Sequence, residues 1–304
     1  MSFSNDVRTE LRTAVRGRTG RAACLYGMLL FCRTIAPDEI CFQSESSVSA
    51  EFFAELFSRV FGTELVFTEK VRRSGAVLRS CRITDASLIS EVYTRYSLGN
   101  GRHILRQLVN ESNAGAFAAG AFLAAGSVND PSKEYHLEFS SPEEPLAAEL
   151  LDMLAEIGVK AKYTLRRGQY VVYVKDSDSI EDVLTFMGAS QCTLDMINIC
   201  IFKDVRNKAN RIANCDSANI DKVVEASIKQ IADIRLIDET IGLSVLPDDL
   251  REIAALRLEN DGMSLKEIGE SLSVPLTRSG VNHRFRRIAK IADEIRNGGN
   301  AVEK

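Results

Sequence analysis

Residues 113–127 read NAGAFAAGAFLAAGS, and a related stretch occurs earlier in the chain as RAACLYGMLLFCR at residues 21–33. Both stretches are apolar, rich in small residues, and carry a glycine at the matching place, Gly27 and Gly120. In the second stretch four alanines recur at steps that place them on one helix face: Ala114, Ala118, Ala121 and Ala125. Because small side chains let a partner backbone approach closely, the sequence predicts two buried core helices that pack on each other.

The segments that follow the two helices are similar in kind. After the first helix the patterns predict a strand, a helix, two strands and a helix, at residues 39–46, 50–61, 63–70, 76–84 and 86–96. After the second they predict the same order, at residues 135–140, 142–157, 160–166, 169–175 and 179–187. Each half therefore reads α-β-α-β-β-α, and Gly27 and Gly120 set the offset at 93 residues. We expect an α+β fold in which two pseudo-twofold-related halves share one core.

Beyond residue 190 the strand patterns stop and the chain reads as all-helical. We expect five parts: an N-terminal helical arm at 1–19, the duplicated domain at 20–190 with repeats at about 20–97 and 113–188, a linker helix at 191–220, an all-α domain at 221–297, and a disordered tail at 298–304. In the arm, Arg8, Arg12 and Arg16 recur every four residues, which is typical of a solvated stripe.

The all-α domain contains the pattern of a helix-turn-helix. Ser264 and Glu267 form a capping box that opens a short helix ending at Ser271. After a turn that contains Pro275, Thr277 caps a second helix. Its apolar positions fall on one face: Val281, Phe285, Ile288 and Ile291. In DNA-binding proteins of this design the second helix lies in the major groove.

Charge supports a DNA-binding role, because no acidic residue occurs between residues 271 and 292. The start of the second helix is predicted to face base edges, through Thr277, Arg278, Ser279, Asn282 and His283. Other side chains are predicted to lie nearer the phosphates: Arg284, Arg286, Arg287 and Lys290. Ser264 and Lys266, on the first helix, complete the predicted DNA-binding set. The alternative is a basic amphipathic helix that faces solvent or a protein partner.

A second polar group lies in the segment between the two domains. It consists of Lys203, Arg206, Asn207, Asn210, Arg211 and Asn214. Since asparagine is a poor helix former, the high asparagine content of this helical segment requires an explanation. Contact with DNA and a polar network that packs the segment onto a domain explain it equally well.

Several classes of protein are disfavoured by the remaining composition. The net charge of −4 argues against indiscriminate coating of nucleic acid, and no apolar stretch is long enough to cross a bilayer. The seven cysteines contain no C-x-x-C pair and the three histidines have no metal-binding spacing, so we expect no metal and no cofactor. No nucleophile–base pair, phosphate loop or dinucleotide glycine motif occurs. We expect a cytoplasmic, nucleoid-associated protein without a membrane partner.

The duplicated domain resembles the LAGLIDADG homing-endonuclease fold, with the motifs at Leu25–Arg33 and Ala118–Gly126. The C-terminal domain is similar to region 4 of sigma factors. This combination, together with the blocks RNKANRIANCDSAN, AGAFLAAGSVNDPSKEYHLE and LTRSGVNHRFRRI, resembles the WhiA family from about Ser2 to Asn297. The resemblance implies a bacterial transcription regulator tied to sporulation in filamentous actinobacteria, and to cell division and chromosome segregation in Firmicutes-like bacteria.

The resemblance also locates the positions where a nuclease of this fold carries its metal-binding acids. They are held here by Cys32 and Ala125, and neither a neutral thiol nor an alanine is the oxygen ligand that Mg²⁺ requires. Asp38 and Asp130 come later and read as turn or cap residues. We therefore expect the scaffold without its chemistry, and a protein that is not an enzyme.

The sequence thus predicts a sequence-selective DNA-binding protein of cell division and chromosome segregation. Its expected partners are double-stranded DNA at promoter or chromosomal sites and, as candidates, a sigma factor, RNA polymerase or another regulator. Two alternatives stay open: a protein-interaction adaptor with weak DNA binding, and a residual Mg²⁺-dependent endonuclease that uses displaced acids such as Asp130. The duplicated domain could hold DNA, a protein or a ligand; against DNA stand its acids Glu39, Glu45, Glu64, Glu69, Glu134 and Glu138.

Overall fold

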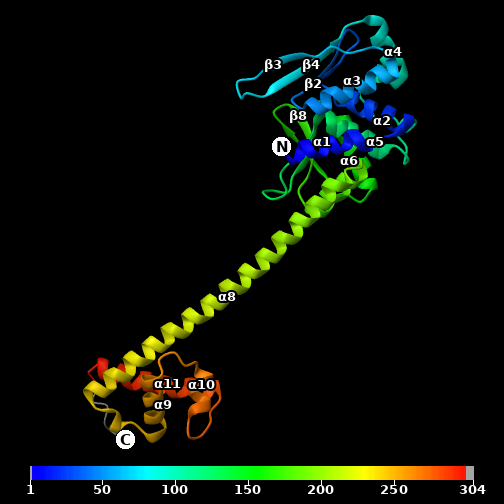
Figure 1. Ribbon diagram of the computed structural model, residues 1–304. Coiled ribbons are helices and arrows are strands. Elements are labelled where there is room, and N and C mark those ends of the chain that lie inside the picture. Colours follow the sequence, from blue (N-terminus) through cyan, green and yellow to red (C-terminus); the bar gives the residue numbers. More distant parts are fainter. Residues whose placement is uncertain (1, 299–304) are drawn as a thin grey trace. The chain divides into compact units, whose positions relative to one another are not determined.

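The computed structural model describes residues 2–298 and divides into two compact units, Met1–Val205 and Arg206–Lys304 (Figure 1). The division falls inside one continuous helix, α8 (Ser190–Thr240). The expected start of the all-α domain at residue 221 therefore lies within a helix and not at a loop. Of the expected disordered tail, residues 299–304 lie outside the described residues.

The first unit contains the duplication. Its first half comprises α2 (Gly17–Leu30), β1 (Thr34–Ile35), β2 (Ile40–Ser44), α3 (Ser47–Phe61), β3 (Thr68–Val71), β4 (Val77–Ile83) and α4 (Ala86–Tyr96), followed by the 3-10 turn η1 (Leu98–Asn100). The second half comprises α5 (Ala114–Ala125), β5 (Gly126–Val128), β6 (Leu137–Ser141), α6 (Glu144–Glu156), β7 (Lys162–Arg166), β8 (Gln169–Val174) and α7 (Ser177–Met187). The two sheets are antiparallel and have matching strand orders, β1-β2-β4-β3 and β5-β6-β8-β7. The predicted α+β class and the duplication are confirmed.

Each half carries one short strand that the sequence patterns did not predict. β1 and β5 directly follow the motif helices and pair with β2 and β6 at the sheet edge. They are two and three residues long, so no alternation of apolar and polar residues can mark them in the sequence.

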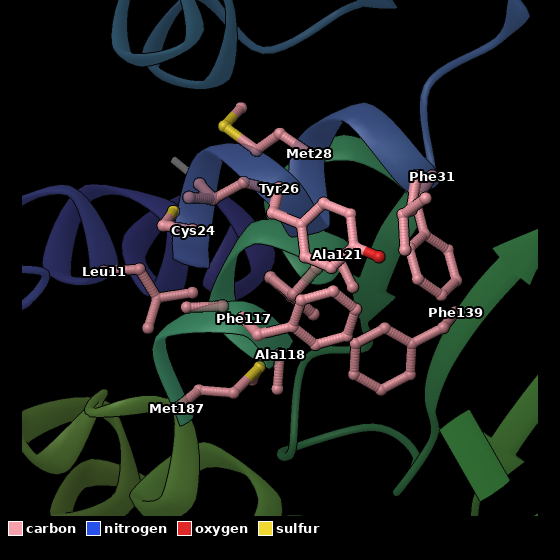
Figure 2. Close-up of a cluster of buried hydrophobic side chains, with 14 of the residues drawn as sticks. Leu11, Cys24, Tyr26, Met28, Phe31, Phe117, Ala118, Ala121, Phe139 and Met187 are labelled. Carbon is pink, nitrogen blue, oxygen red and sulfur yellow. The ribbon is translucent and has the colours of Figure 1, made fainter. Parts of the chain in front are cut away.

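The motif helices α2 and α5 pack against each other at the centre of the first unit, and Figure 2 shows the side chains around this contact. A Cβ built on Gly27 would lie 2.2 Å from the carbonyl oxygen of Phe117, and one on Gly120 would lie 2.0 Å from that of Cys24. Cys24 and Phe117 are themselves offset by 93 residues. The contact is therefore made twice, once by each half, as pseudo-twofold symmetry requires, and both glycines are needed for the close approach.

The N-terminal helix α1 (Phe3–Ala14) belongs to the core of the first unit and is not a separate arm. Val7 and Leu11 are fully buried, and the helix packs against α3 and α5. The predicted solvated stripe is wrong for Arg8, whose guanidinium lies over the ring of Phe122, 5.4 Å from its centroid. The prediction of a helix is confirmed. Its burial could not be predicted, because the surfaces of α3 and α5 that cover it are formed only when the chain folds.

The second unit is all-helical. Besides the C-terminal part of α8 it contains η2 (Leu243–Val245), α9 (Asp248–Glu259), α10 (Leu265–Ser271) and α11 (Arg278–Arg296). Its core is formed by buried side chains from all four α-helices, including Ile234, Ile253, Ile268, Phe285 and Ile288. The predicted capping box on α10 and the Thr277 cap on α11 are both present.

Candidate nucleic-acid interface

The turn between α10 and α11 is fixed by a backbone contact. The amide of Leu276 donates to the carbonyl of Gly269 at 2.9 Å. A Cβ on Gly269 would lie 2.3 Å from the carbonyl oxygen of Leu276, so no other residue fits this position without displacing the turn. Gly269 therefore packs directly against the backbone of the turn, and this contact sets the orientation of α11 relative to α10.

Caps fix the starts of both helices. The Ser264 hydroxyl accepts from the amide of Glu267 at 3.3 Å, and the Glu267 carboxylate accepts from the amide of Ser264 at 2.7 Å. Hydrogen bonding to the carboxylate from the backbone and side chain of Ser264 holds the pKa of Glu267 below its ordinary value. At α11 the Thr277 hydroxyl accepts from the amide of Gly280 at 3.3 Å. The first turn of α11 is thus pre-formed before any ligand arrives.

One face of α11 packs on the core and the opposite face is free. The buried face is formed by Val281, Phe285, Ile288 and Ala292. The side chains on the other side are exposed: Arg278, Ser279, His283, Arg286, Arg287 and Lys290. Asn282 is half-buried beside them. An amide, an imidazole and guanidinium groups along one helix face supply the donors and acceptors that read base edges in a major groove.

Two arginines that were predicted to contact phosphates hold a carboxylate of their own unit. The Asp249 carboxylate on α9 lies 3.6 Å from Arg284 Nε and 3.0 Å from Arg287 Nη1. Arg284 also donates to the Asp249 carbonyl at 3.4 Å and is only 20% exposed in its side chain. These contacts brace α11 against α9. The phosphate role of Arg284 and Arg287 stays a prediction.

The two lysines of the predicted set have intrahelical carboxylate neighbours. Lys266 Nζ lies 3.8 Å from Glu270, and Lys290 Nζ lies 3.9 Å from Glu294. Both lysines are about 80% exposed in their side chains. Such exposed pairs are weak in water, so either ammonium group is available to a phosphate.

The polar segment of α8 splits between two environments. Lys203 donates to the carbonyl of Pro131 at 2.8 Å and lies 4.5 Å from the centroid of the Tyr135 ring, all within the first unit. The other members are exposed along α8: Arg206, Asn207, Asn210, Arg211 and Asn214. Lys203 therefore anchors α8 to the first unit, whereas a DNA contact by the exposed residues stays a prediction.

Sequence reasoning missed Arg257, which is only 2% exposed in the second unit. It donates to Gln230 Oε1 at 3.0 Å and to the carbonyl of Met263 at 2.6 Å, and it lies over the ring of Phe285. Burial lowers its pKa. A signal existed, since Arg257 follows Leu250, Ile253 and Ala254 on the apolar face of α9. This arginine ties α8, α9 and the loop before α10 together.

The two positions of the absent nuclease acids lie beside one cavity of about 1210 Å³ in the first unit. Cys32 is buried and its thiol donates to the carbonyl of Thr34 at 3.2 Å. Burial raises the pKa of this thiol to about 12, so it is neutral near pH 7. Ala125 is the last residue of α5 and offers no ligand atom.

An arginine stands at the C-terminal end of each motif helix. Arg102 donates to the carbonyl of Leu30 at 2.9 Å and to that of Cys32 at 2.6 Å. Arg8 donates to the carbonyl of Gly126 at 2.6 Å. Guanidinium groups complement the negative ends of these helices. They also place positive charge where a nuclease would hold Mg²⁺, so the residues present do not fit a divalent cation.

Most of the acids that weighed against DNA at the sheets have a basic or polar neighbour. Glu39 lies 3.3 Å from Arg82, Glu45 lies 2.8 Å from Arg72, and Glu69 lies 2.9 Å from Arg79. Further pairs join Glu138 to His136 at 3.0 Å and Glu134 to the Asn129 amide at 3.3 Å. Three of the six acids, Glu39, Glu45 and Glu69, are thus paired with arginines of the same unit.

Asp130, the acid that a residual nuclease would use, has a structural role. It accepts from the amide of Ser132 at 2.9 Å, and hydrogen bonds from Ser132 hold its pKa below its ordinary value. This confirms that Asp130 is a turn residue. Within residues 2–298, no three His, Cys, Asp or Glu side chains gather as a metal site would require. No helix in the same range has both the length and the apolar content needed to span a bilayer.

Two family models and several known proteins match this chain. A family model described as "WhiA C-terminal HTH domain" matches residues 209–292, and one described as "WhiA LAGLIDADG-like domain" matches residues 114–206. A "Probable cell division protein WhiA" of Lachnospira eligens is 36% identical over 97% of this chain and 98% of its own length. One of the same name from Alkaliphilus metalliredigens is 47% identical over 60% of this chain and 57% of its own length.

Solved structures show the same fold. The full-length DUF199/WhiA crystal structure from Thermatoga maritima aligns with a TM-score of 0.60 at 23% identity, covering 97% of this chain and 99% of that one. The N-terminal LAGLIDADG domain of DUF199/WhiA aligns with a TM-score of 0.50 at 17% identity, covering 62% of this chain and 90% of that one. With the near-complete match to the Lachnospira eligens protein, these findings show that the chain belongs to the WhiA family.

Proposed function

We propose that the protein binds double-stranded DNA in a sequence-selective way and acts through this binding in cell division. The observation that carries the proposal is the free face of α11, with its pre-formed first turn and a short helix α10 braced before it. The family description of residues 209–292 as a helix-turn-helix domain and the cell-division names of the relatives support it.

In the proposed complex α11 enters the major groove. Asn282 can pair with the N6 and N7 atoms of an adenine, and Arg286 can pair with the O6 and N7 atoms of a guanine. Arg278 and Lys290, at the two ends of the exposed face, are placed to contact the phosphates of flanking nucleotides. Arg278 and Arg286 thus exchange the roles expected from the sequence, because Arg278 opens α11 and Arg286 lies one turn after Asn282 on the exposed face. Different residues of α11 thus recognise the bases and contact the DNA phosphates.

The test begins with selection of a preferred duplex from random DNA by the full-length protein. Binding to that duplex and to a scrambled one is then measured by fluorescence anisotropy at several salt concentrations. Asn282→Ala removes a base-reading group, so we expect the preference for the selected duplex to fall by about tenfold or more. The salt dependence should be unchanged, because no phosphate contact is lost. Absence of any preferred duplex would instead favour the protein-interaction adaptor.

We also propose that the protein is not an enzyme. Cys32 and Ala125 supply no metal ligand, and Arg102 and Arg8 occupy the ends of the motif helices. Supercoiled plasmid incubated with the protein and Mg²⁺ should remain intact. If the plasmid is nicked and Asp130→Ala abolishes the nicking, the alternative hypothesis of a residual endonuclease would be established.

The wider role that we propose is regulation at promoters and chromosomal sites during cell division, chromosome segregation and, in sporulating bacteria, sporulation. RNA polymerase, a sigma factor or another regulator would then be its protein partner. A fluorescent fusion should co-localise with the nucleoid and become diffuse when Asn282→Ala and Arg286→Ala are combined. Retention of the nucleoid signal in this variant would separate localisation from base reading.

A further inference from the structure

The second unit contains a pocket in which three members of the predicted DNA-binding set, Ser264, Lys266 and Arg278, meet residues outside that set. It has a volume of about 540 Å³ and lies where α8 passes the start of α10 and the start of α11. Lys222 comes from α8, Lys266 from α10 and Arg278 from α11, with Arg257 of α9 as a fourth cation. Four helices therefore bring their positive groups to one pocket.

All the charged residues that line the pocket are cationic. No Asp or Glu is among its lining residues. Of the two acids of α10, Glu267 is held in the capping box. Glu270 lies 3.8 Å from the lining residue Lys266, in an exposed pair that is weak in water. Two lysines and two arginines without a lining carboxylate repel one another in the empty pocket, and an anion relieves that repulsion.

The pocket combines a fixed floor with a movable rim. Arg257 is held by Gln230 and by the carbonyls of Asp261 and Met263. Lys222, Lys266 and Arg278 are exposed and can turn towards a ligand. Val223 and Leu265 add apolar wall, which suits a sugar next to an anionic group.

We propose that this pocket receives a sugar–phosphate segment of the bound duplex, so that α8 forms part of the DNA interface. The inference rests on the proposed function, because it requires that α11 bind DNA. Arg278 connects the two sites, since it is the first residue of α11 and also lines the pocket. A strand that passes the start of α11 therefore reaches Lys222 without leaving the protein surface.

The experiment compares Lys222→Ala with Lys229→Ala in the full-length protein. Both lysines are exposed on α8, but only Lys222 lines the pocket. We expect Lys222→Ala to weaken binding several-fold on the selected and scrambled duplexes alike. The slope of log affinity against log salt should become shallower by about 0.9, the value for one phosphate contact. Lys229→Ala should leave both quantities unchanged.

A second measurement locates the phosphate. Methylphosphonate is introduced at single positions of the selected duplex, which removes one backbone charge at a time. One position should weaken binding of the unmodified protein and have no further effect on Lys222→Ala. Equal losses in both proteins at every position would overturn the proposal.

Inorganic phosphate and pyrophosphate serve as probes for a free anion. If either stabilises the unmodified protein but not Lys222→Ala against thermal unfolding, while duplex binding is the same in both, the pocket serves a small anion and the proposal is wrong. If the unmodified protein shows no salt-dependent binding to any duplex, the proposed function fails first and the inference fails with it. Normal salt-dependent binding with equal behaviour of Lys222→Ala and Lys229→Ala would overturn the inference alone.

Discussion

At Gly27 and Gly120 a hydrogen atom points at a backbone carbonyl that lies closer than any Cβ could tolerate. Both residues lie inside helices, where glycine is otherwise unfavourable by about 0.5–1 kcal/mol relative to alanine. Their presence therefore reflects packing and not helix formation. The glycine motif was visible in the sequence, but the atoms that it meets were not.

Gly120→Ala should destabilise the protein by about 3 kcal/mol or more, because the new methyl group would lie 2.0 Å from the Cys24 carbonyl oxygen. Gly20→Ala is the matched control in α2, since its Cβ would meet only the Ala116 methyl at 3.8 Å. That variant should be neutral or slightly stabilising. Denaturant midpoints measure both; equal midpoints would contradict the packing described here.

Thiol reactivity should divide the seven cysteines by burial. Cys215 is exposed and Cys200 is partly exposed, whereas five are buried: Cys24, Cys32, Cys41, Cys81 and Cys192. Burial raises the pKa of Cys32 and Cys192 to about 12, so their reactive thiolate forms are scarce at pH 8. Iodoacetamide at pH 8 should label Cys215 fastest, and the buried set only after unfolding, as mass spectrometry can establish. Rapid labelling of Cys32 in the folded protein would contradict its placement.

The absence of metal ligands at Cys32 and Ala125 could be inferred from the sequence, because it depends only on which residue types stand there. The arginines near them could not. Arg102 lies in the loop that joins the halves, and Arg8 lies in a helix interpreted as solvated. Each arginine is at least 70 residues away in sequence from the carbonyl to which it donates. Residue spacing along one segment cannot predict contacts at that separation.

At the scale of elements, long periodic segments were predicted well. The short strands β1 and β5 and the extent of α8, which runs through both units, were not. The helices and the longer strands follow from apolar spacing, which one segment displays by itself. β1 and β5 exist only because β2 and β6 offer them a partner edge. The single helix α8 was divided at residue 220 because its polar composition resembles a linker, although the backbone continues unbroken to Thr240.

The turn between α10 and α11 gives a sharp prediction at this scale. Gly269→Ala would force a methyl group to within 2.3 Å of the Leu276 carbonyl oxygen, and the turn would have to open. We expect lower stability of the second unit and loss of most duplex affinity. Gly280→Ala is the control for stability, because its Cβ would meet only side chains, at 3.6 Å. Thermal unfolding followed by circular dichroism compares the two, and an unaffected Gly269→Ala would show that the turn is not fixed as described.

At the scale of the whole molecule, net charge is a poor guide to the proposed partner. The chain carries −4 overall, yet the free face of α11 and the pocket beside it are cationic. Part of the negative charge of the first unit is paired with neighbouring arginines, as at Glu39, Glu45 and Glu69. Where charge lies decides attraction to DNA more than its sum does.

The reciprocal contact of α2 and α5 has a consequence for how such a chain could arise. Each half buries one face of its motif helix against the other half. A single half would expose that face, so we expect it to pair with a second copy of itself. When two copies are joined through the loop after η1, their association becomes intramolecular. Each half then meets the other at a high effective concentration. A chain nicked within that loop should accordingly stay together as two fragments. Once the copies are covalently linked, each is also free to diverge, as the different residues at Cys32 and Ala125 illustrate.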